Sequence, residues 1–346
     1  MKNCKISFVR NTPSWLIENV ISGLSDIEGI KFHHLKEGGD YLFATPFMYS
    51  SFVSFSDFLD KAPSAITIMH CVGEAIMPDL NIFDYYIGFY PEACGDRIIQ
   101  RLYERELRRK ISECKKRPAV QILKEKKAFC NFIYSNGKGH PMRGQLFDLL
   151  SHYRKVDAPG RYKHNIDILT SRHNKDWLSE SIDLKNPYKF SISAENAWFP
   201  GYTSEKLLTS MLADTLPIYW GNPEISNEFN PDSFIHVDHY SNLNELLEFI
   251  ISVDLDDQII IKKKNEPWRL KKQIEEDDRI FEHYVKRYGN IFKQPIEKAF
   301  RKGNGYFEDM YRNQMKAGMG LRLLNENISS NCMKFIKNMP RFFRNK

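Results

Sequence analysis

The sequence predicts an α/β protein with two Rossmann-like domains that face a cleft. The chain has 346 residues, enough for about two domains of 100–200 residues each. Short apolar runs alternate with amphipathic or polar segments in two separate series, a pattern typical of parallel sheets whose strands are joined by helices. A charged stretch that ends in KEKK separates the two series. We therefore expect one domain over 1–122, a second over 123–305, and a helical, basic tail over 306–346.

The first series predicts the elements of the N-terminal domain. A helix is expected over Ser14–Leu24, where apolar residues recur at helical spacing. The block 103–116, YERELRRKISECKK, is so highly charged that it predicts a solvated helix followed by a connector. The apolar runs that predict strands lie at 5–9, 41–45, 65–70 and 85–89.

The second series begins with FCNFIY at 129–134, a buried-strand pattern, followed by the glycine-rich loop SNGKGHP. Leucines recur on one face of Met142–Tyr153, which predicts a helix. The charged segment 266–288 predicts a further long helix. Polar side chains follow several of the predicted strands, and ligands of open parallel sheets bind at the carboxyl ends of the strands.

The segment 188–237 has the densest pattern of the chain. YKFSISA and LPIYW predict two strands, and the loop ENAWFPGYT brings Glu195, Asn196 and Tyr202 together. A helix follows the loop, because a hydroxyl residue of the Thr-Ser pair can cap it and an apolar stripe comes next. Free backbone N–H groups at such a helix start favour anions, so a phosphate-bearing ligand is expected there.

This segment resembles the donor-binding signature of the α-1,3/4-fucosyltransferases, glycosyltransferase family 10, which reads YKFxLxFEN…GYVTEKIxxAxxxGTIPIYWG…FNPxSFI. The departures are Ala194 for Phe, Thr203-Ser204 for Val-Thr, and Ala213-Asp214 for a small residue and Gly. None of them removes a charged group. Residues 70–97 resemble a second pattern of the family, GEnxxPnxnlxDYaIGF followed by a DR pair.

The resemblance implies a GT-B fold and a bacterial α-1,3-fucosyltransferase. Such an enzyme transfers L-fucose from GDP-fucose, with inversion, to O3 or O4 of N-acetylglucosamine in a β-galactoside-type acceptor, here for lipopolysaccharide or O-antigen glycans. Two alternatives stay open. One is a GT-B transferase that uses another nucleotide sugar, and the other is a non-catalytic protein that binds glycans or membranes.

Two cations near helix starts are expected to bind the diphosphate. Arg143 lies in the first turn of its predicted helix and Lys206 in the first turn of the next one; a planar guanidinium binds phosphate oxygens through two donors. Glu205 can accept two hydrogen bonds from a ribose diol, although it also suits the helix dipole. For Tyr202, packing in the core is the alternative, and for Arg143 a position on the helix surface. Glu195 can either hold the loop or contact hydroxyls of the donor sugar. The donor-binding set implied by the resemblance is Arg143, Glu195, Asn196, Tyr202, Glu205 and Lys206.

Glu74 is the candidate general base, a role that the resemblance assigns to the Glu of the GE pair. Inverting transfer needs one carboxylate to take the proton of the acceptor hydroxyl. Glu74 follows a predicted strand in the N-terminal, acceptor-side domain, and Ala75 replaces the usual Asn. An exposed loop glutamate is the alternative without the resemblance. Asp84 and Arg97 are expected to orient this region structurally.

No metal or cofactor is expected, although a divalent metal can stimulate such enzymes. The DxD string 254–256 lies far from the signature, and we expect it to be structural. We expect the same of His236, Asp238 and His239. The formal net charge of +6 favours anionic partners, but no nucleic-acid-binding motif is present, so nucleic acid is not an expected partner.

The location expected from the sequence is the bacterial cytoplasm. The six cysteines form no CxxC pair, no signal peptide is visible, and no apolar stretch reaches the length of about 18 residues that suggests a spanning helix. Basic and apolar residues mix from Asn331 to Lys346, which fits peripheral contact with the inner membrane. A basic end that is disordered or packed on the fold is the alternative.

Overall fold

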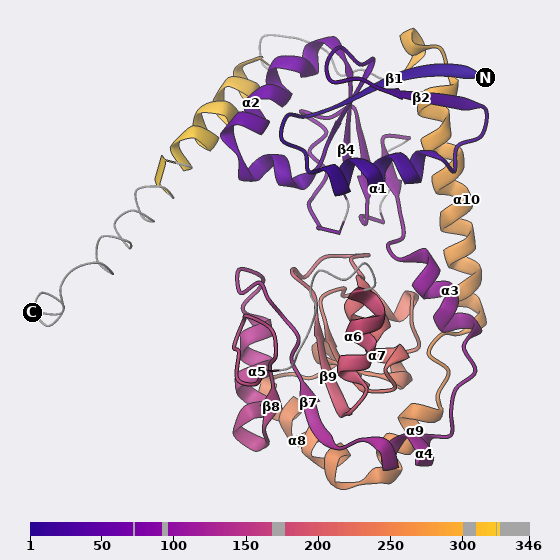
Figure 1. The fold of residues 1–346 in the computed structure, drawn as a ribbon, viewed down its shortest axis with the longest axis vertical. Helices are drawn as coiled ribbons and strands as arrows, with labels where there is room; N and C mark the ends of the chain where they lie inside the picture. The colour runs from indigo at the N-terminus through magenta and orange to yellow at the C-terminus, as the bar shows by residue number, and fades with distance from the viewer. Residues whose placement is uncertain (72, 92–95, 168–176, 300–308, 323, 326–346) are drawn as a thin grey trace, which may run out of the picture. The chain divides into compact units, whose positions relative to one another are not determined.

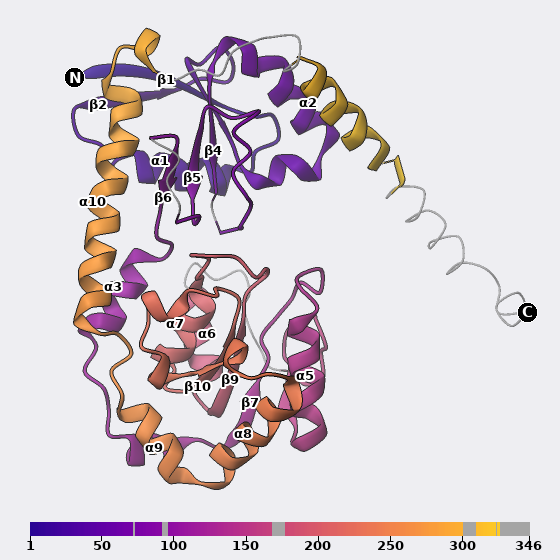
Figure 2. The ribbon, with the colours of Figure 1, turned by 180° about the vertical axis from the view of Figure 1, so that it is seen from behind.

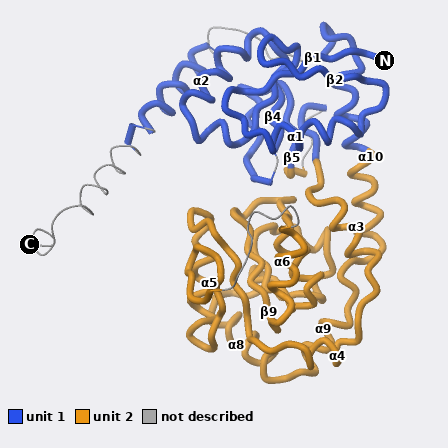
Figure 3. The backbone as a smooth tube through the Cα atoms, viewed as in Figure 1, with its two compact units in different colours: residues 1–88, 92–100, 283–346 blue, residues 89–91, 101–282 orange. Residues whose placement is uncertain are grey.

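The computed structural model describes residues 1–71, 73–91, 96–167, 177–299, 309–322 and 324–325. The chain forms two compact units, coloured separately in Figure 3. Unit 1 takes residues 1–88, 92–100 and 283–346, and unit 2 takes residues 89–91 and 101–282.

Unit 1 contains a six-stranded parallel sheet in the order β2-β1-β3-β4-β5-β6. The helices α1 (Ser14–Leu24) and α2 (Phe52–Lys61) belong to this unit (Figure 1). The predicted helix and four predicted strands are confirmed, and β2 and β6 are additional. The strands are β1 (Lys2–Phe8), β2 (Ile30–His34), β3 (Tyr41–Ala44), β4 (Ile66–His70), β5 (Tyr85–Gly88) and β6 (Ile98–Gln100).

Unit 2 contains a five-stranded parallel sheet in the order β11-β10-β9-β7-β8. The strands are β7 (Ala128–Asn131), β8 (Val156–Asp157), β9 (Tyr188–Ala194), β10 (Leu216–Trp220) and β11 (Ile235–His236). The helices are α3 (Arg105–Glu113), α4 (Ala119–Glu125), α5 (Met142–Tyr153), α6 (Trp177–Lys185), α7 (Glu205–Leu212), α8 (Leu243–Leu255) and α9 (Asp257–Asn265). Two Rossmann-like domains are thus present, as predicted.

The sheet of unit 2 has helices on both faces. Figures 1 and 2 show α5 and α8 on one side and α6 and α7 on the other. Alternate side chains of a strand point to opposite faces. Ile218 therefore joins the core under α5 and α8, whereas Tyr219 joins the core under α7. In β9 the buried Ser191 and Ser193 face α7, where Ser210 bonds both hydroxyls.

The unit boundaries differ from the predicted positions 122 and 305. Helix α3 belongs to unit 2, because Leu107 and Ile111 join the core under α7 and Arg108 is ion-paired with Glu228 and Asp277. The charged block around α3 is therefore not simply a solvated helix.

Helix α10 (Lys271–Lys293) crosses from one unit to the other along the chain. Its C-terminal end belongs to unit 1, where Phe292 packs against Tyr41 and Phe43 of β3. Farther along, residues 309–322 are helical, whereas the predicted membrane contact from Asn331 to Lys346 lies outside the described residues.

Candidate functional site

A pocket of about 600 Å³ lies at the carboxyl ends of β7, β8 and β9 in unit 2. Its volume is within the range of about 300–1,000 Å³ that is usual for small-molecule sites. The loops after the three strands and the helices α5, α6 and α7 form its wall. The predicted site residues in this wall are Arg143, Asn196, Glu205 and Lys206.

Glu195 lies directly behind the pocket wall and holds the start of α7. Its carboxylate is fully buried and accepts hydrogen bonds from the Ser204 backbone N–H at 2.8 Å and the Ser204 hydroxyl at 2.6 Å. Lys206 Nζ donates to Glu195 Oε2 at 3.2 Å and to Ser204 Oγ at 2.9 Å. Gly221, at φ +146°, leaves room for the stem of the Glu195 side chain, because a Cβ there would lie 2.5 Å from Glu195 Cβ and Cγ. Glu195 thus positions Lys206 and has no place in the wall itself.

The positive charge of Lys206 is already paired with the carboxylates of Glu195 and Glu205. Burial by itself would lower the pKa of Lys206, but the carboxylates of Glu195 and Glu205 outweigh burial and hold the pKa well above its usual value. For Glu205 burial would raise the pKa, and Lys206 leads the opposing effects that leave this pKa lowered. The Lys206 and Glu205 side chains are 19% and 21% exposed, so both charges can reach a ligand in the pocket.

Arg143 has hydrogen-bonding capacity that no described residue uses. Its side chain is 2% exposed, Nε donates to the Ala194 carbonyl at 3.1 Å, and the guanidinium lies 4.7 Å from the centre of the Tyr134 ring. Nη2 is buried without a hydrogen-bond partner among the described residues. A buried donor of this kind is costly unless a ligand or water satisfies it. The pocket therefore offers a fixed cation that suits an anionic group.

Lys185 is a pocket residue that sequence reasoning missed. It ends α6, is 6% exposed, and donates through Nζ to Thr209 Oγ1 at 2.6 Å and to Ser210 Oγ at 3.1 Å. Burial lowers the pKa of Lys185 to about 7, and the nearby Lys206 acts in the same direction. The Lys of WLSESIDLK resembles an ordinary surface lysine in sequence, and only the fold brings it under α7.

Tyr202 is placed in the core and not in the pocket wall. It is fully buried, and its ring packs edge-on against Phe89 at 4.9 Å between ring centres. This position fits core packing, the alternative for this residue, and contact with a donor stays a prediction. Asn196, by contrast, lines the pocket, and its carbonyl accepts a hydrogen bond from the His140 backbone N–H at 2.9 Å.

Residues 123–291 match the model of the family described as glycosyltransferase family 10 (fucosyltransferase) C-term. The chain carries a glycosyltransferase family 10 domain. This domain includes the whole of the pocket wall, whose residues run from Ile133 to Thr209.

Curated relatives match part of the chain. A putative fucosyltransferase R654 of Acanthamoeba polyphaga mimivirus is 36% identical over 152 residues, 43% of this chain and 25% of the relative. The alpha-(1,3)-fucosyltransferase FucT of Helicobacter pylori is 28% identical over 210 residues, 51% of this chain and 42% of the relative. The chain thus spans less than half the length of either relative.

Solved structures share the fold over most of the chain. A crystal structure of α1,3-fucosyltransferase aligns with a TM-score of 0.63 at 19% identity, covering 82% of this chain and 90% of that chain. The crystal structure of α1,3-fucosyltransferase with GDP-fucose aligns with a TM-score of 0.62 at 21% identity, covering 82% and 91%. The predicted GT-B fold class is confirmed by this likeness.

Glu74 lies outside the family 10 domain, on the loop after β4 of unit 1. It is half-buried and follows Gly73, whose φ of +80° lets the chain turn away from the strand end. Asp84 accepts hydrogen bonds from the Thr67 backbone and hydroxyl at 2.7 and 2.9 Å, and Arg97 donates to three backbone carbonyls nearby. The structural role expected of Asp84 and Arg97 thus agrees with their contacts.

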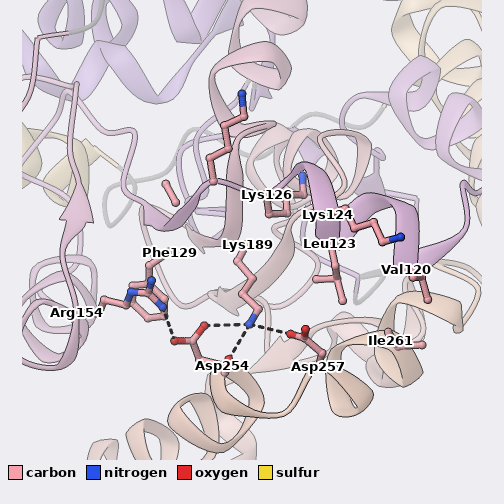
Figure 4. A pocket seen from close by; sticks show the side chains of 12 residues that line it. Val120, Leu123, Lys124, Lys126, Phe129, Arg154, Lys189, Asp254, Asp257 and Ile261 are labelled. Carbon is pink, nitrogen blue, oxygen red and sulfur yellow. Dashed lines mark hydrogen bonds and ion pairs between the residues drawn. The ribbon is translucent and has the colours of Figure 1, made fainter.

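The DxD string of the family 10 domain is a structural element, as expected. Figure 4 shows Asp254 at the edge of a second pocket of about 380 Å³. Its carboxylate is ion-paired with Lys189 at 3.2 Å and with Arg154 at 3.0 Å, and Tyr153 donates to it at 3.0 Å. Asp256 caps α9 by accepting from the Gln258 backbone. Both carboxylates already have partners that hold helices in place.

The histidines at the end of β11 also contact protein groups. His236 Nε2 lies 3.8 Å from Asp238 Oδ2, and the His236 ring packs on His239 at 4.6 Å. Burial lowers the pKa of His236 to about 4, with His239 adding to the effect. Trp198 Nε1 donates to Asp238 at 3.0 Å. Within the described ranges, no group of three or more His, Cys, Asp or Glu residues is arranged to hold a metal ion.

Among the helices that the structure describes, none is both long enough and apolar enough to cross a bilayer.

Proposed function

We propose that this protein is an α-1,3-fucosyltransferase that uses GDP-fucose. It transfers L-fucose with inversion to O3, or O4, of N-acetylglucosamine in a β-galactoside-type acceptor. The observation that carries the proposal is the pocket of unit 2. There the buried guanidinium of Arg143, whose Nη2 has no hydrogen-bond partner among the residues that the structure describes, lines the same pocket as a Glu-Lys pair at a helix start. The curated relatives named above bear fucosyltransferase names.

The donor is held by groups of opposite charge. Arg143 and Lys206 bind the diphosphate, and the positive end of the α7 helix dipole adds to the positive field. Glu205 accepts hydrogen bonds from the ribose hydroxyls, and Asn196 contributes to the same wall. As the bond to fucose breaks, negative charge grows on GDP, and fixed cations in a water-poor pocket stabilise that charge.

Glu74 acts as the general base on the acceptor. Its carboxylate takes the proton of the acceptor hydroxyl while the hydroxyl oxygen forms the bond to the anomeric carbon of fucose. The bond from that carbon to the β-phosphate oxygen breaks, and GDP leaves. One displacement inverts the anomeric centre, so no covalent intermediate with the protein is required. No metal is required either, because Arg143 and Lys206 take the place of a metal ion beside the diphosphate.

The proposed setting is lipopolysaccharide or O-antigen synthesis in the bacterial cytoplasm. The mixture of basic and apolar residues from Asn331 to Lys346 supports peripheral contact with the inner membrane. There, each cation near an anionic leaflet contributes about 1 kcal/mol.

The test is a transfer assay with GDP-fucose and N-acetyllactosamine, its β1,3-linked isomer and glucose-based analogues. Arg143→Ala and Lys206→Ala are each expected to lower kcat/KM by about 100-fold or more, since each removes a charge opposite the leaving group. Substantial activity is expected to survive EDTA. Near-normal kinetics in either variant would contradict the donor assignment, and complete, metal-reversible loss in EDTA would contradict the metal-free mechanism. A panel of other nucleotide sugars tests the alternative that the donor differs.

A further inference from the structure

An exposed tryptophan lies beside the pocket that is proposed to bind the donor. Trp198 is 52% exposed and follows Asn196 of the pocket wall by two residues, in the loop after β9. It neither lines this pocket nor belongs to the cores under α5 and α8 or under α7. The pocket lies at the ends of β7, β8 and β9, whereas Trp198 contacts the turn after β11, on the other side of β9. An aromatic side chain that the core does not use thus lies at the carboxyl edge of the sheet, where open parallel sheets bind ligands.

The ring of Trp198 is held in a defined orientation by groups of the protein. Its Nε1 donates to Asp238 Oδ2 at 3.0 Å, and Asp238 belongs to the turn that follows β11. The backbone next to the ring is fixed as well, because the Phe199 N–H donates to the Gly221 carbonyl at 3.0 Å, directly after β10. A ring that is already held in this way loses little conformational entropy when a ligand packs on it.

The groups around the ring suit a neutral sugar better than an anion. A pyranose can present a face of C–H groups to the flat, apolar surface of an indole, while the hydroxyl groups at its rim need polar partners. The Asp238 side chain is 30% exposed beside the indole, and a carboxylate accepts hydrogen bonds from hydroxyl groups. The same negative charge disfavours a phosphate or an anionic lipid headgroup at this place.

We propose that Trp198 is a stacking platform for one pyranose of the acceptor glycan, and that Asp238 fixes the indole and accepts a hydrogen bond from a hydroxyl of that sugar. The inference rests on the proposed function, in which an acceptor hydroxyl has to reach the anomeric carbon of the donor. A sugar on Trp198 lies at the same sheet edge as the donor pocket, next to Asn196 of its wall. The unit that binds the donor then also supplies part of the acceptor subsite.

The experiment measures steady-state kinetics of the full chain, with GDP-fucose and the best acceptor of the panel above varied in turn. Trp198→Ala is expected to raise the KM for the acceptor by about 10-fold, the size of effect seen when a tryptophan anchor is truncated. The KM for GDP-fucose and the affinity for GDP are expected to stay unchanged. Leu255→Ala is the matched control, since Leu255 is an apolar side chain, 77% exposed, at the end of α8, and it is expected to change neither KM.

Two further variants separate the parts of the platform. Trp198→Tyr keeps an aromatic face and is expected to retain most of the affinity for the acceptor. Asp238→Asn can still accept from the indole through its amide oxygen but lacks the charge. It is expected to raise the KM for the acceptor by about 3-fold or more, because a hydrogen bond to a charged acceptor is stronger than one to a neutral acceptor. An unchanged KM for the acceptor in Asp238→Asn overturns the contact between this carboxylate and the sugar.

The outcomes distinguish this inference from the proposed function. An acceptor KM in Trp198→Ala equal to that of the wild type, or an equal rise in the KM for GDP-fucose, overturns the platform and leaves fucosyl transfer intact. Absence of transfer by the wild type to every acceptor of the panel overturns the proposed function and the inference with it. If Trp198→Ala does not fold, Trp198→Leu gives the test, because it keeps an apolar side chain without a flat face. It is expected to raise the KM for the acceptor by about 10-fold, and a wild-type value refutes the inference.

Discussion

Replacing Glu195 by Gln should separate the placement of Lys206 from its charge. The change keeps the size of the side chain and removes one buried negative charge. In the native protein the carboxylate accepts from the Ser204 N–H, the Ser204 hydroxyl and Lys206 Nζ. An amide has only one oxygen to offer these donors, and its NH₂ group would face another donor. The variant therefore changes a buried contact at the start of α7 and leaves the residues that line the pocket unaltered.

The expected loss of stability follows from burial. Breaking a buried ion pair by removing one partner costs about 3–5 kcal/mol, because the remaining charge is left uncompensated. Lys206 keeps Glu205 as a second partner at 3.4 Å and is 19% exposed, so we expect the lower end, about 3 kcal/mol. That is a large part of a typical total stability of about 5–15 kcal/mol. Affinity for GDP should fall as well, because Lys206 loses the group that fixes its position.

Urea unfolding and GDP titration of the same samples measure both effects. Glu205→Gln is the control for stability: Glu205 is partly exposed and makes a longer contact with Lys206, so its loss should cost less than about 1 kcal/mol while still weakening GDP binding. If Glu195→Gln is as stable as the wild type and binds GDP with unchanged affinity, the reasoning that this carboxylate holds Lys206 in place is refuted.

Three further measurements test other parts of the mechanism. Glu74→Gln should keep GDP-fucose affinity and strongly lower transfer, since an amide cannot accept the proton; an equal loss of donor binding would assign Glu74 to the donor or to structure. GDP affinity should decrease as pH rises from 7 to 9, with proton uptake on binding, because the pKa of Lys185 is lowered to about 7 in the free protein and an anion raises it again. A pH-independent affinity, or the same pH dependence in Lys185→Met, would exclude this linkage. A chain that ends at Ile328 should sediment less with anionic vesicles than the full chain, whereas equal partitioning, or loss of folded enzyme, would favour a tail packed on the fold.

The signature segment was predictable because its information is local. Strands β9 and β10 are apolar runs with clear ends, and the Thr-Ser pair before α7 is a common cap. The sequence predicts Glu195 as a site residue. Its burial and its hydrogen bonds to Ser204 depend on Gly221, which follows β10 and leaves room for the Glu195 side chain. A sequence pattern can thus identify a carboxylate at a strand end without saying whether it faces the ligand or supports a residue that does.

Contacts between residues far apart in the sequence explain other differences between the predicted and the observed structure. Helix α3 has a charged sequence that predicts solvation, yet Arg108 is 1% exposed. Its charge is balanced by Glu228 and Asp277, more than a hundred residues away in the chain. Helix α6 was missed because WLSESIDLK has little apolar periodicity: the face that would normally be apolar lines the pocket instead. In both cases the residue types suit partners that local spacing does not reveal.

Arg143 and Lys206, the two pocket residues proposed to bind the diphosphate, have different hydrogen-bond partners in the free protein, and this difference predicts different kinetic effects. Arg143 has a buried Nη2 without a partner among the described residues, so a donor phosphate satisfies it without breaking a protein contact. Lys206 already donates to Glu195, Ser204 and Glu205, so a phosphate competes with these acceptors for its protons.

The leaving diphosphate carries more negative charge than the diphosphate of the intact donor. It therefore competes better with the protein acceptors for the protons of Lys206. Arg143→Ala should therefore raise the KM for GDP-fucose at least as strongly as it lowers kcat, whereas Lys206→Ala should act mainly on kcat. Steady-state kinetics with GDP-fucose as the varied substrate distinguish these patterns. If both variants changed KM and kcat in the same proportion, the state of each cation in the free protein would have no bearing on its role in the transition state.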